Sequence, residues 1–150
     1  MKELLDSLIE KSFIQREALI ELLEVLRDEK DALRNNKSDL LPGLLERLQD
    51  VSSKAMLAEA ERTKAAGKLA QTLGCNPVVR EICDLLDSGD ADRLKASAGD
   101  LLATVVSIKE INFILSKQAE EYNFLAEMTL KRLKGFIRPG KAAATLDTTA

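Results

Sequence analysis

The fold follows mainly from residues 90–138, DADRLKASAGDLLATVVSIKEINFILSKQAEEYNFLAEMTLKRLKGFIR. Residues in this stretch recur at seven-residue spacing along two lines, which lie three or four residues apart. The lines are Leu94, Leu101, Ile108, Leu115, Tyr122, Thr129 and Phe136, and Ala98, Val105, Asn112, Ala119, Ala126 and Leu133. This spacing predicts one long helix that packs on other long helices. At ~1.5 Å per residue, the helix would be roughly 70 Å long.

Two further amphipathic helices are predicted upstream, over residues 3–34 and 40–73. The segment 35–39 between them is polar and rich in Asn, which tolerates the left-handed conformation that ends a helix. Pro42 then falls in the first turn of the second helix, where its missing N–H costs little. The two helices are therefore expected to fold back on one another as a hairpin.

The seams of these two helices differ in composition. The first seam is rich in Leu but carries polar layers at residues 12–16 and 29–30. The second seam turns from Leu to Ala after Val51. Because Ala buries little apolar area, at roughly 25 cal/mol per Å², this part of the bundle should be weakly stabilised.

A short helix is predicted at residues 78–86, before the long one. The expected fold class is all-α: an elongated antiparallel helical bundle or coiled coil of three long helices plus one short helix. We expect a single helical-bundle domain over residues 1–138. Residues 139–150 are rich in Ala and Thr and are expected to form a flexible C-terminal tail.

Composition argues against several classes of function. The net charge is −3 and the pI about 5.2, whereas a nucleic-acid-binding protein needs a basic surface. The chain has no His, no phosphate-binding Gly-rich motif, and only two Cys, Cys75 and Cys83, without zinc-ligand spacing. We therefore expect no enzyme activity, no cofactor and no metal. No apolar run approaches ~20 residues and no cleavable signal is seen, which predicts a cytoplasmic protein without membrane insertion.

The long helix has more apolar residues than one packing seam needs. The surplus residues lie off both lines and are Leu102, Val106, Phe113, Phe124 and Leu130. A helix needs about one apolar face to join a bundle. The surplus therefore indicates a second contact, which is either a third packing neighbour or a partner protein.

Three features together resemble the FlgN family of flagellar type III export chaperones. The first is the acidic, Leu-rich end of the first helix at residues 26–33. The second is LPGLLE at residues 41–46, which follows a short polar break. The third is INFIL at residues 111–115, with Tyr122 further along the same helix. The resemblance covers about residues 3–140.

This resemblance implies a function and a site. Members of the family hold the hook-associated (junction) proteins of the flagellum unassembled and deliver them to the export gate. Their C-terminal helix and tail engage the substrate protein. The corresponding substrate-protein-binding residues here would be Phe113, Phe124, Met128, Leu130, Leu133, Phe136 and Ile137. The expected partners are therefore terminal amphipathic segments of hook-associated flagellar proteins and the flagellar export apparatus.

Asn112 has a separate expected role. It lies on the second line of the long helix, where a polar side chain fixes the register of packed helices at some cost in stability. The sequence also departs from the family pattern. Many members have two Asn three residues apart, and Lys109 stands at the first position. Many have a Tyr-Gly after the last helix, where this chain has GFIRPG at residues 135–140.

Two other interpretations fit the helical pattern. The chain could be a structural coiled-coil adaptor or stalk subunit that acts as an obligate oligomer, or a small regulatory bundle. The chaperone interpretation predicts a monomer or weak homodimer that binds an isolated amphipathic segment. A structural subunit would instead be a permanent oligomer, so oligomeric state discriminates between the two.

Overall fold

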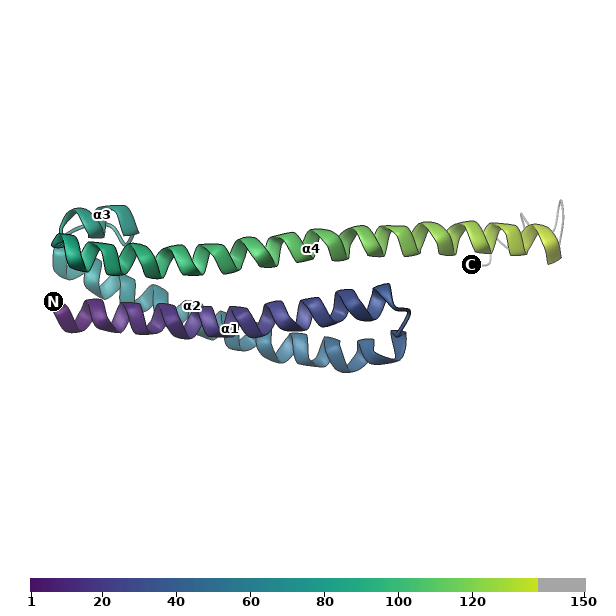
Figure 1. Ribbon diagram of the computed structural model, residues 1–150, viewed down its shortest axis with the longest axis horizontal. Helices are drawn as coiled ribbons and strands as arrows, with labels where there is room; N and C mark the ends of the chain where they lie inside the picture. Colours follow the sequence, from purple (N-terminus) through teal and green to yellow (C-terminus); the bar gives the residue numbers. More distant parts are fainter. Residues whose placement is uncertain (138–150) are drawn as a thin grey trace. The chain divides into compact units, whose positions relative to one another are not determined.

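A computed structural model describes residues 1–137 (Figure 1). Helical segments make up 91% of these residues, and no strand occurs among them. In chain order the segments are α1 (Lys2–Arg34), the 3-10 turn η1 (Ser38–Leu40), α2 (Leu41–Leu73), α3 (Val79–Asp84) and α4 (Ser88–Ile137). The predicted all-α helical bundle of three long helices and one short helix is confirmed.

The chain divides into two compact units, residues 1–112 and residues 113–150. The first unit holds α1, η1, α2, α3 and the beginning of α4. The second holds the rest of α4. The single domain expected over residues 1–138 stays a prediction, and the tail expected at 139–150 lies outside the described residues.

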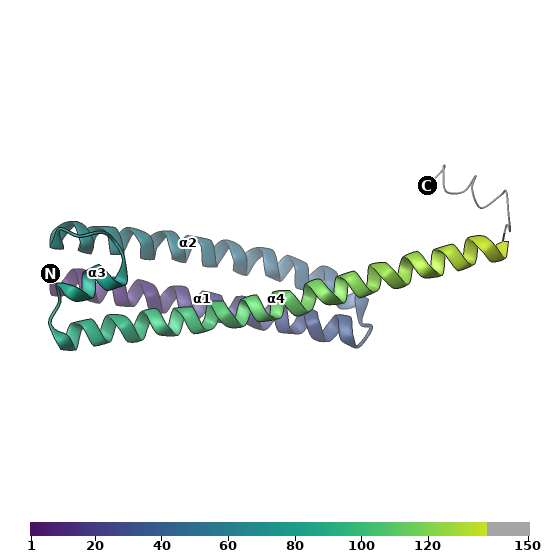
Figure 2. The same ribbon diagram turned by 90° about the horizontal axis from the view of Figure 1, so that it is seen from above.

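In the first unit, α1 and α2 pack against one another as the predicted hairpin (Figure 2). The turn is made by Asn36, whose φ of 55° is left-handed, and by the amide of Lys37, which donates to the carbonyl of Ala32 over 2.8 Å. Pro42 lies in the first turn of α2. Gly74, with a φ of 74°, ends α2 in the left-handed conformation that favours glycine.

The main core cluster lies where α1 begins, α2 ends and α4 begins. Its residues are Leu5, Leu8, Ala65, Ala66, Leu69, Ala70, Ile82, Cys83, Ala91 and Leu94. A second, smaller cluster further along the hairpin consists of Ala18, Ala55 and Ala58. The change from Leu to Ala along α2 therefore produces a core of small residues, as the sequence indicated.

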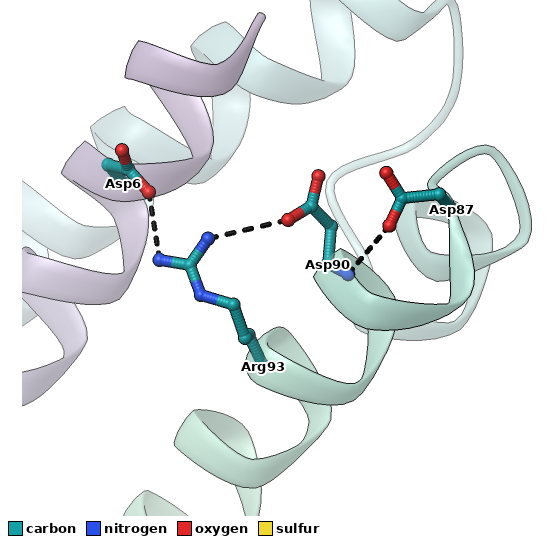
Figure 3. Close-up of polar contacts among 4 residues, drawn as sticks. All are labelled: Asp6, Asp87, Asp90 and Arg93. Atoms are coloured by element: carbon teal, nitrogen blue, oxygen red, sulfur yellow. Dashed lines mark hydrogen bonds and ion pairs between the residues drawn. The ribbon is translucent and has the colours of Figure 1, made fainter.

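A polar contact joins the start of α4 to α1 (Figure 3). The guanidinium of Arg93 donates to the carboxylate of Asp6 over 2.8 Å and to that of Asp90 over 3.4 Å. The hydrogen bond to Asp6 is the main reason that the pKa of Arg93 is raised. The Asp87 carboxylate accepts from the amide of Asp90 over 2.8 Å and so caps α4. Exposed ion pairs stabilise weakly, so this contact adds little to the stability of the fold.

The second seam line of α4 differs from the predicted one. Thr104 and Ile111 are buried, whereas Val105 is half-buried and Asn112 is exposed. The predicted placement of Asn112 in the seam was therefore wrong. Steps of three and of four residues both keep a side chain near one face of a helix, so periodicity alone permits either line. Burying Ile111 rather than Asn112 removes more apolar area from water.

A buried polar pair occupies the α1–α2 interface instead. The Gln15 side chain is buried, and its carbonyl oxygen accepts a hydrogen bond from Nε of the half-buried Arg62. One turn away, the buried Ser12 hydroxyl donates to the Leu8 carbonyl over 2.8 Å. Ser12 and Gln15 belong to the first predicted polar layer of α1, and Arg62 lies across from them on α2. A cross-helix pair of this kind fixes the register of a hairpin.

Replacing Gln15 with Leu is expected to lower the free energy of unfolding by about 1–2 kcal/mol, because Arg62 loses its acceptor at a half-buried position. The double variant Gln15→Leu/Arg62→Leu should lose less than the sum of the two single variants. Urea unfolding of the four forms gives this coupling. Strictly additive losses would show that the two side chains do not stabilise the fold through one another.

Candidate functional site

The predicted site residues that the structure describes are exposed on α4. Their side-chain exposures are 64% for Phe113, 62% for Phe124, 37% for Met128, 51% for Leu130, 50% for Leu133 and 60% for Ile137. The side chain of Phe136 lies outside the described part of the chain. Large apolar side chains exposed together mark a surface that binds another molecule more often than scattered single ones do.

These residues form two surfaces rather than one. At 100° per residue, Phe113, Phe124 and Met128 fall on one side of α4, within an arc of about 60°. We call this the Phe surface. Leu130, Leu133 and Ile137 follow the i, i+3, i+7 spacing and lie about 150° away. We call this the Leu surface. The sequence-based site is thus split between nearly opposite sides of one helix.

Charged groups interrupt the Phe surface. The ammonium of Lys117 lies 5.6 Å from the centre of the Phe113 ring, within the range of a cation–π contact. The same ammonium is 3.3 Å from the Glu120 carboxylate. By helical periodicity, both charged residues stand between Phe113 and Phe124. The Leu surface has closer spacing, with its three apolar residues inside two turns, and is the more continuous apolar patch.

The described residues offer little for catalysis. No group of three His, Cys, Asp or Glu that could hold a metal ion occurs among them. Burial raises the pKa of the Cys83 thiol, with smaller contributions from neighbouring charges, and its sulfur lies 3.6 Å from the Ala91 carbonyl oxygen. A raised pKa lowers the thiolate fraction and hence reactivity. Cys83 therefore acts as a small core residue.

Glu29, in the second polar layer of α1, has a pKa raised from 4.5 by burial. Its ionised form is thus less favourable in the folded state than in the unfolded state. The folded protein binds the proton more tightly, so this group lowers stability as the pH rises through and above 4.5.

Glu29→Gln should therefore stabilise the fold near pH 7, and the gain should shrink as the pH falls toward 4.5. Glu24→Gln, at an exposed position of the same helix, is the matched control and should show no such trend. Thermal melts of both variants across this pH range test the prediction. A gain that is independent of pH would mean that charge at Glu29 is not the cause.

The hairpin carries exposed apolar residues that sequence reasoning did not single out. They are Phe13 and Ile14 on α1 and Met56 and Leu57 on α2. All four lie away from the predicted packing seams, and this offset is the sequence signal that could have identified them as exposed. Ile14 and Leu57 also line a groove of about 170 Å³ between the two helices.

No helix among residues 1–137 is both long enough and apolar enough to cross a membrane. No curated protein and no solved structure shows significant similarity to the chain. The family model described as FlgN protein matches residues 1–121. Among the predicted site residues, this range includes Phe113 but ends before Phe124 and before the Leu surface. The match covers the whole first unit and most of the chain, and it shows that the chain belongs to the FlgN family, a family of flagellar export chaperones.

Proposed function

We propose that this chain holds hook-associated (junction) proteins of the flagellum in an unassembled state and delivers them to the export gate, using the C-terminal half of α4. The observation that carries the proposal is the pair of exposed apolar surfaces on α4, in a chain that belongs to a family of export chaperones. The chain would act in the cytoplasm, before export, without nucleic acid, cofactor or catalysis.

The mechanism is pairing of amphipathic helices. A terminal amphipathic segment of the client would lay its apolar face against α4, as in helix-in-groove recognition. While it is covered, that segment cannot pair with another flagellar subunit. Mass action holds such a complex together, so no nucleotide hydrolysis is required. Release follows when the export apparatus binds the client more tightly.

The Leu surface is the better candidate for the main contact. Its i, i+3, i+7 spacing matches the anchors of helix-in-groove recognition, whereas Lys117 and Glu120 interrupt the Phe surface. Leu130, Leu133 and Ile137 are each about half exposed or more, so a client can still remove substantial apolar area from water. Burial of this kind contributes roughly 1 kcal/mol or more for each side chain.

Co-expression with hook-associated proteins tests the function. We expect the chain to co-purify with at least one of them and to keep it monomeric. A client shortened by its terminal amphipathic segment should not co-purify. Failure of every full-length hook-associated protein to bind would refute the proposal. Binding that survives removal of the terminal segment would retain the chaperone but refute the mechanism.

A further inference from the structure

The outer face of α2, turned away from the core, carries an ordered set of side chains. We define this face by Glu46, Asp50, Leu57, Ala60, Lys64 and Lys68, all of which are exposed. By helical periodicity they fall on one side of α2, opposite the buried side that contains Ala55, Ala66 and Leu69. Leu57 is 66% exposed, and Met56 beside it is exposed as well.

Along the centre of this face charge is sorted by sign, although Lys54, which pairs with Glu21 of α1, and Glu61 flank Leu57 at one edge outside this order. The two acidic residues lie toward the start of α2, the apolar residues at its centre, and the two lysines toward its end. None of the four charged side chains forms an ion pair with any residue in the described part of the chain. Each like-charged pair is four residues apart, a spacing that is unfavourable on an isolated helix.

The helix dipole does not account for this arrangement. Its influence falls off within the first and last turns, residues 41–44 and 70–73 of α2. All four charges lie further inside the helix. An external partner that offers charges in the opposite order would relieve both repulsions at once. The partner face must therefore be basic, then apolar, then acidic along the direction of α2.

The same face of a second copy, turned antiparallel, has that order. Leu57 lies 11 residues from both Glu46 and Lys68, and 7 residues from both Asp50 and Lys64. A two-fold axis at Leu57 therefore sets each acidic residue opposite a lysine of the other copy. It also sets the two Leu57 side chains against one another. A parallel pair would set like charges together, so the charges select the antiparallel arrangement.

We propose that the outer face of α2 binds the same face of a second copy of this chain, in an antiparallel pair with a two-fold axis at Leu57. The contact is isologous, so each surface is its own partner and the assembly closes as a dimer. Beside Leu57, a groove of about 170 Å³ is lined by Ile14, Ala18 and Ala58 together with the charged residues Lys11, Lys54 and Glu61. It leaves apolar surface next to the two-fold axis for the second copy to cover.

The size of the contact determines its strength. Glu46 and Lys68 are separated by about 33 Å along one helix, which places the buried area at the small end of specific interfaces. The predicted dimer is thus weak and reversible. Its ion pairs are exposed, and salt screens exposed charges over about 8 Å at physiological ionic strength. The dimer should therefore dissociate further as salt is added.

Sedimentation velocity of the full chain and of charge-reversed variants tests the proposal. Glu46→Lys/Asp50→Lys makes the face wholly basic, and Lys64→Glu/Lys68→Glu makes it wholly acidic. Each variant alone should dimerise at least about tenfold more weakly than the native chain. An equimolar mixture of the two should form a heterodimer, because each then finds the opposite charge at both ends.

The matched control is Glu121→Lys/Glu127→Lys, which makes the same change of net charge at exposed positions of α4. It should leave dimerisation unchanged. Leu57→Glu places two like charges on the two-fold axis and should weaken the dimer at least about tenfold. Circular dichroism of every variant should show unchanged helicity, since all these positions are exposed.

Three outcomes would overturn the proposal. The first is that the native chain remains monomeric at all concentrations reached. The second is that it dimerises with an affinity that neither charge reversal changes. The third is that both reversals abolish the dimer but their mixture does not restore it. None of these outcomes depends on client binding, so the proposal stands or falls separately from the chaperone function.

Discussion

Replacing Leu69 with Ala is expected to lower the free energy of unfolding by about 3–4 kcal/mol. Leu69 is 0% exposed and lies in the main core cluster, with residues of α1, α3 and α4. Three of its neighbours in that cluster, Ala65, Ala66 and Ala70, are too small to move into the space that its side chain leaves. Because the cavity cannot collapse, the loss in free energy of unfolding should fall in the upper part of the range for Leu→Ala substitutions.

Urea unfolding followed by circular dichroism measures this loss. The matched control is Leu45→Ala, which makes the same substitution on the same helix at an exposed position outside the proposed dimer contact. It should change the free energy of unfolding by no more than about 0.5 kcal/mol. Equal effects of the two substitutions would mean that the main core cluster does not stabilise the fold as described.

Removing the Leu surface is expected to have a large effect on client binding. Replacing Leu130, Leu133 and Ile137 together with Ala should weaken binding of a hook-associated protein's terminal segment about 100-fold, which corresponds to about 2.7 kcal/mol. Helicity and melting temperature should stay nearly unchanged, because these side chains are exposed and Ala favours helix. Calorimetric titration with that segment measures the affinity.

The matched variant replaces Phe113, Phe124 and Met128 with Ala. Because charged groups interrupt the Phe surface, we expect it to weaken binding less than about tenfold. If this variant weakens client binding more than the Leu-surface variant does, the client site lies on the Phe surface. Phe113 is exposed, so its substitution should leave the fold stable. Had it been a core residue, a loss of several kcal/mol would be expected.

The hairpin could be predicted from the sequence because its determinants are local. Asn residues that accept a left-handed turn, Pro42 in a first helical turn and Gly74 at a helix end each act within a few residues. The periodic seams then placed most core positions correctly. The Ala-rich part of α2 at Ala55 and Ala58 followed from the same pattern, whereas Ala18 of α1 was not predicted, since the predicted seam ran through Leu19.

The second seam line could not be predicted because it depends on neighbouring helices. The pairs Thr104–Val105 and Ile111–Asn112 each offer two candidates one step apart, and only packing decides between them. The cross-helix bond between Gln15 and Arg62 was missed for a similar reason. The sequence shows a polar layer in each helix, but it does not show that the two layers meet.

The client site illustrates a different limit. Helical phase, which the sequence alone supplies, already divides the predicted site into two patches, but it does not show which patch binds the client. Helical phase separates Phe124 from Leu133 by about 180°. One straight client helix therefore cannot cover both at once. The family match ends at residue 121, so it does not decide between the two surfaces.

Hydrogen exchange of the chain with and without a bound hook-associated protein shows which segment of the chain contacts the client. Exchange reports how well each backbone segment is protected from solvent and from local opening. We expect client binding to slow exchange in residues 126–137, around the Leu surface, and to leave exchange in the main core cluster unchanged. Protection confined to residues 1–112, with none gained on the C-terminal half of α4, would contradict this expectation.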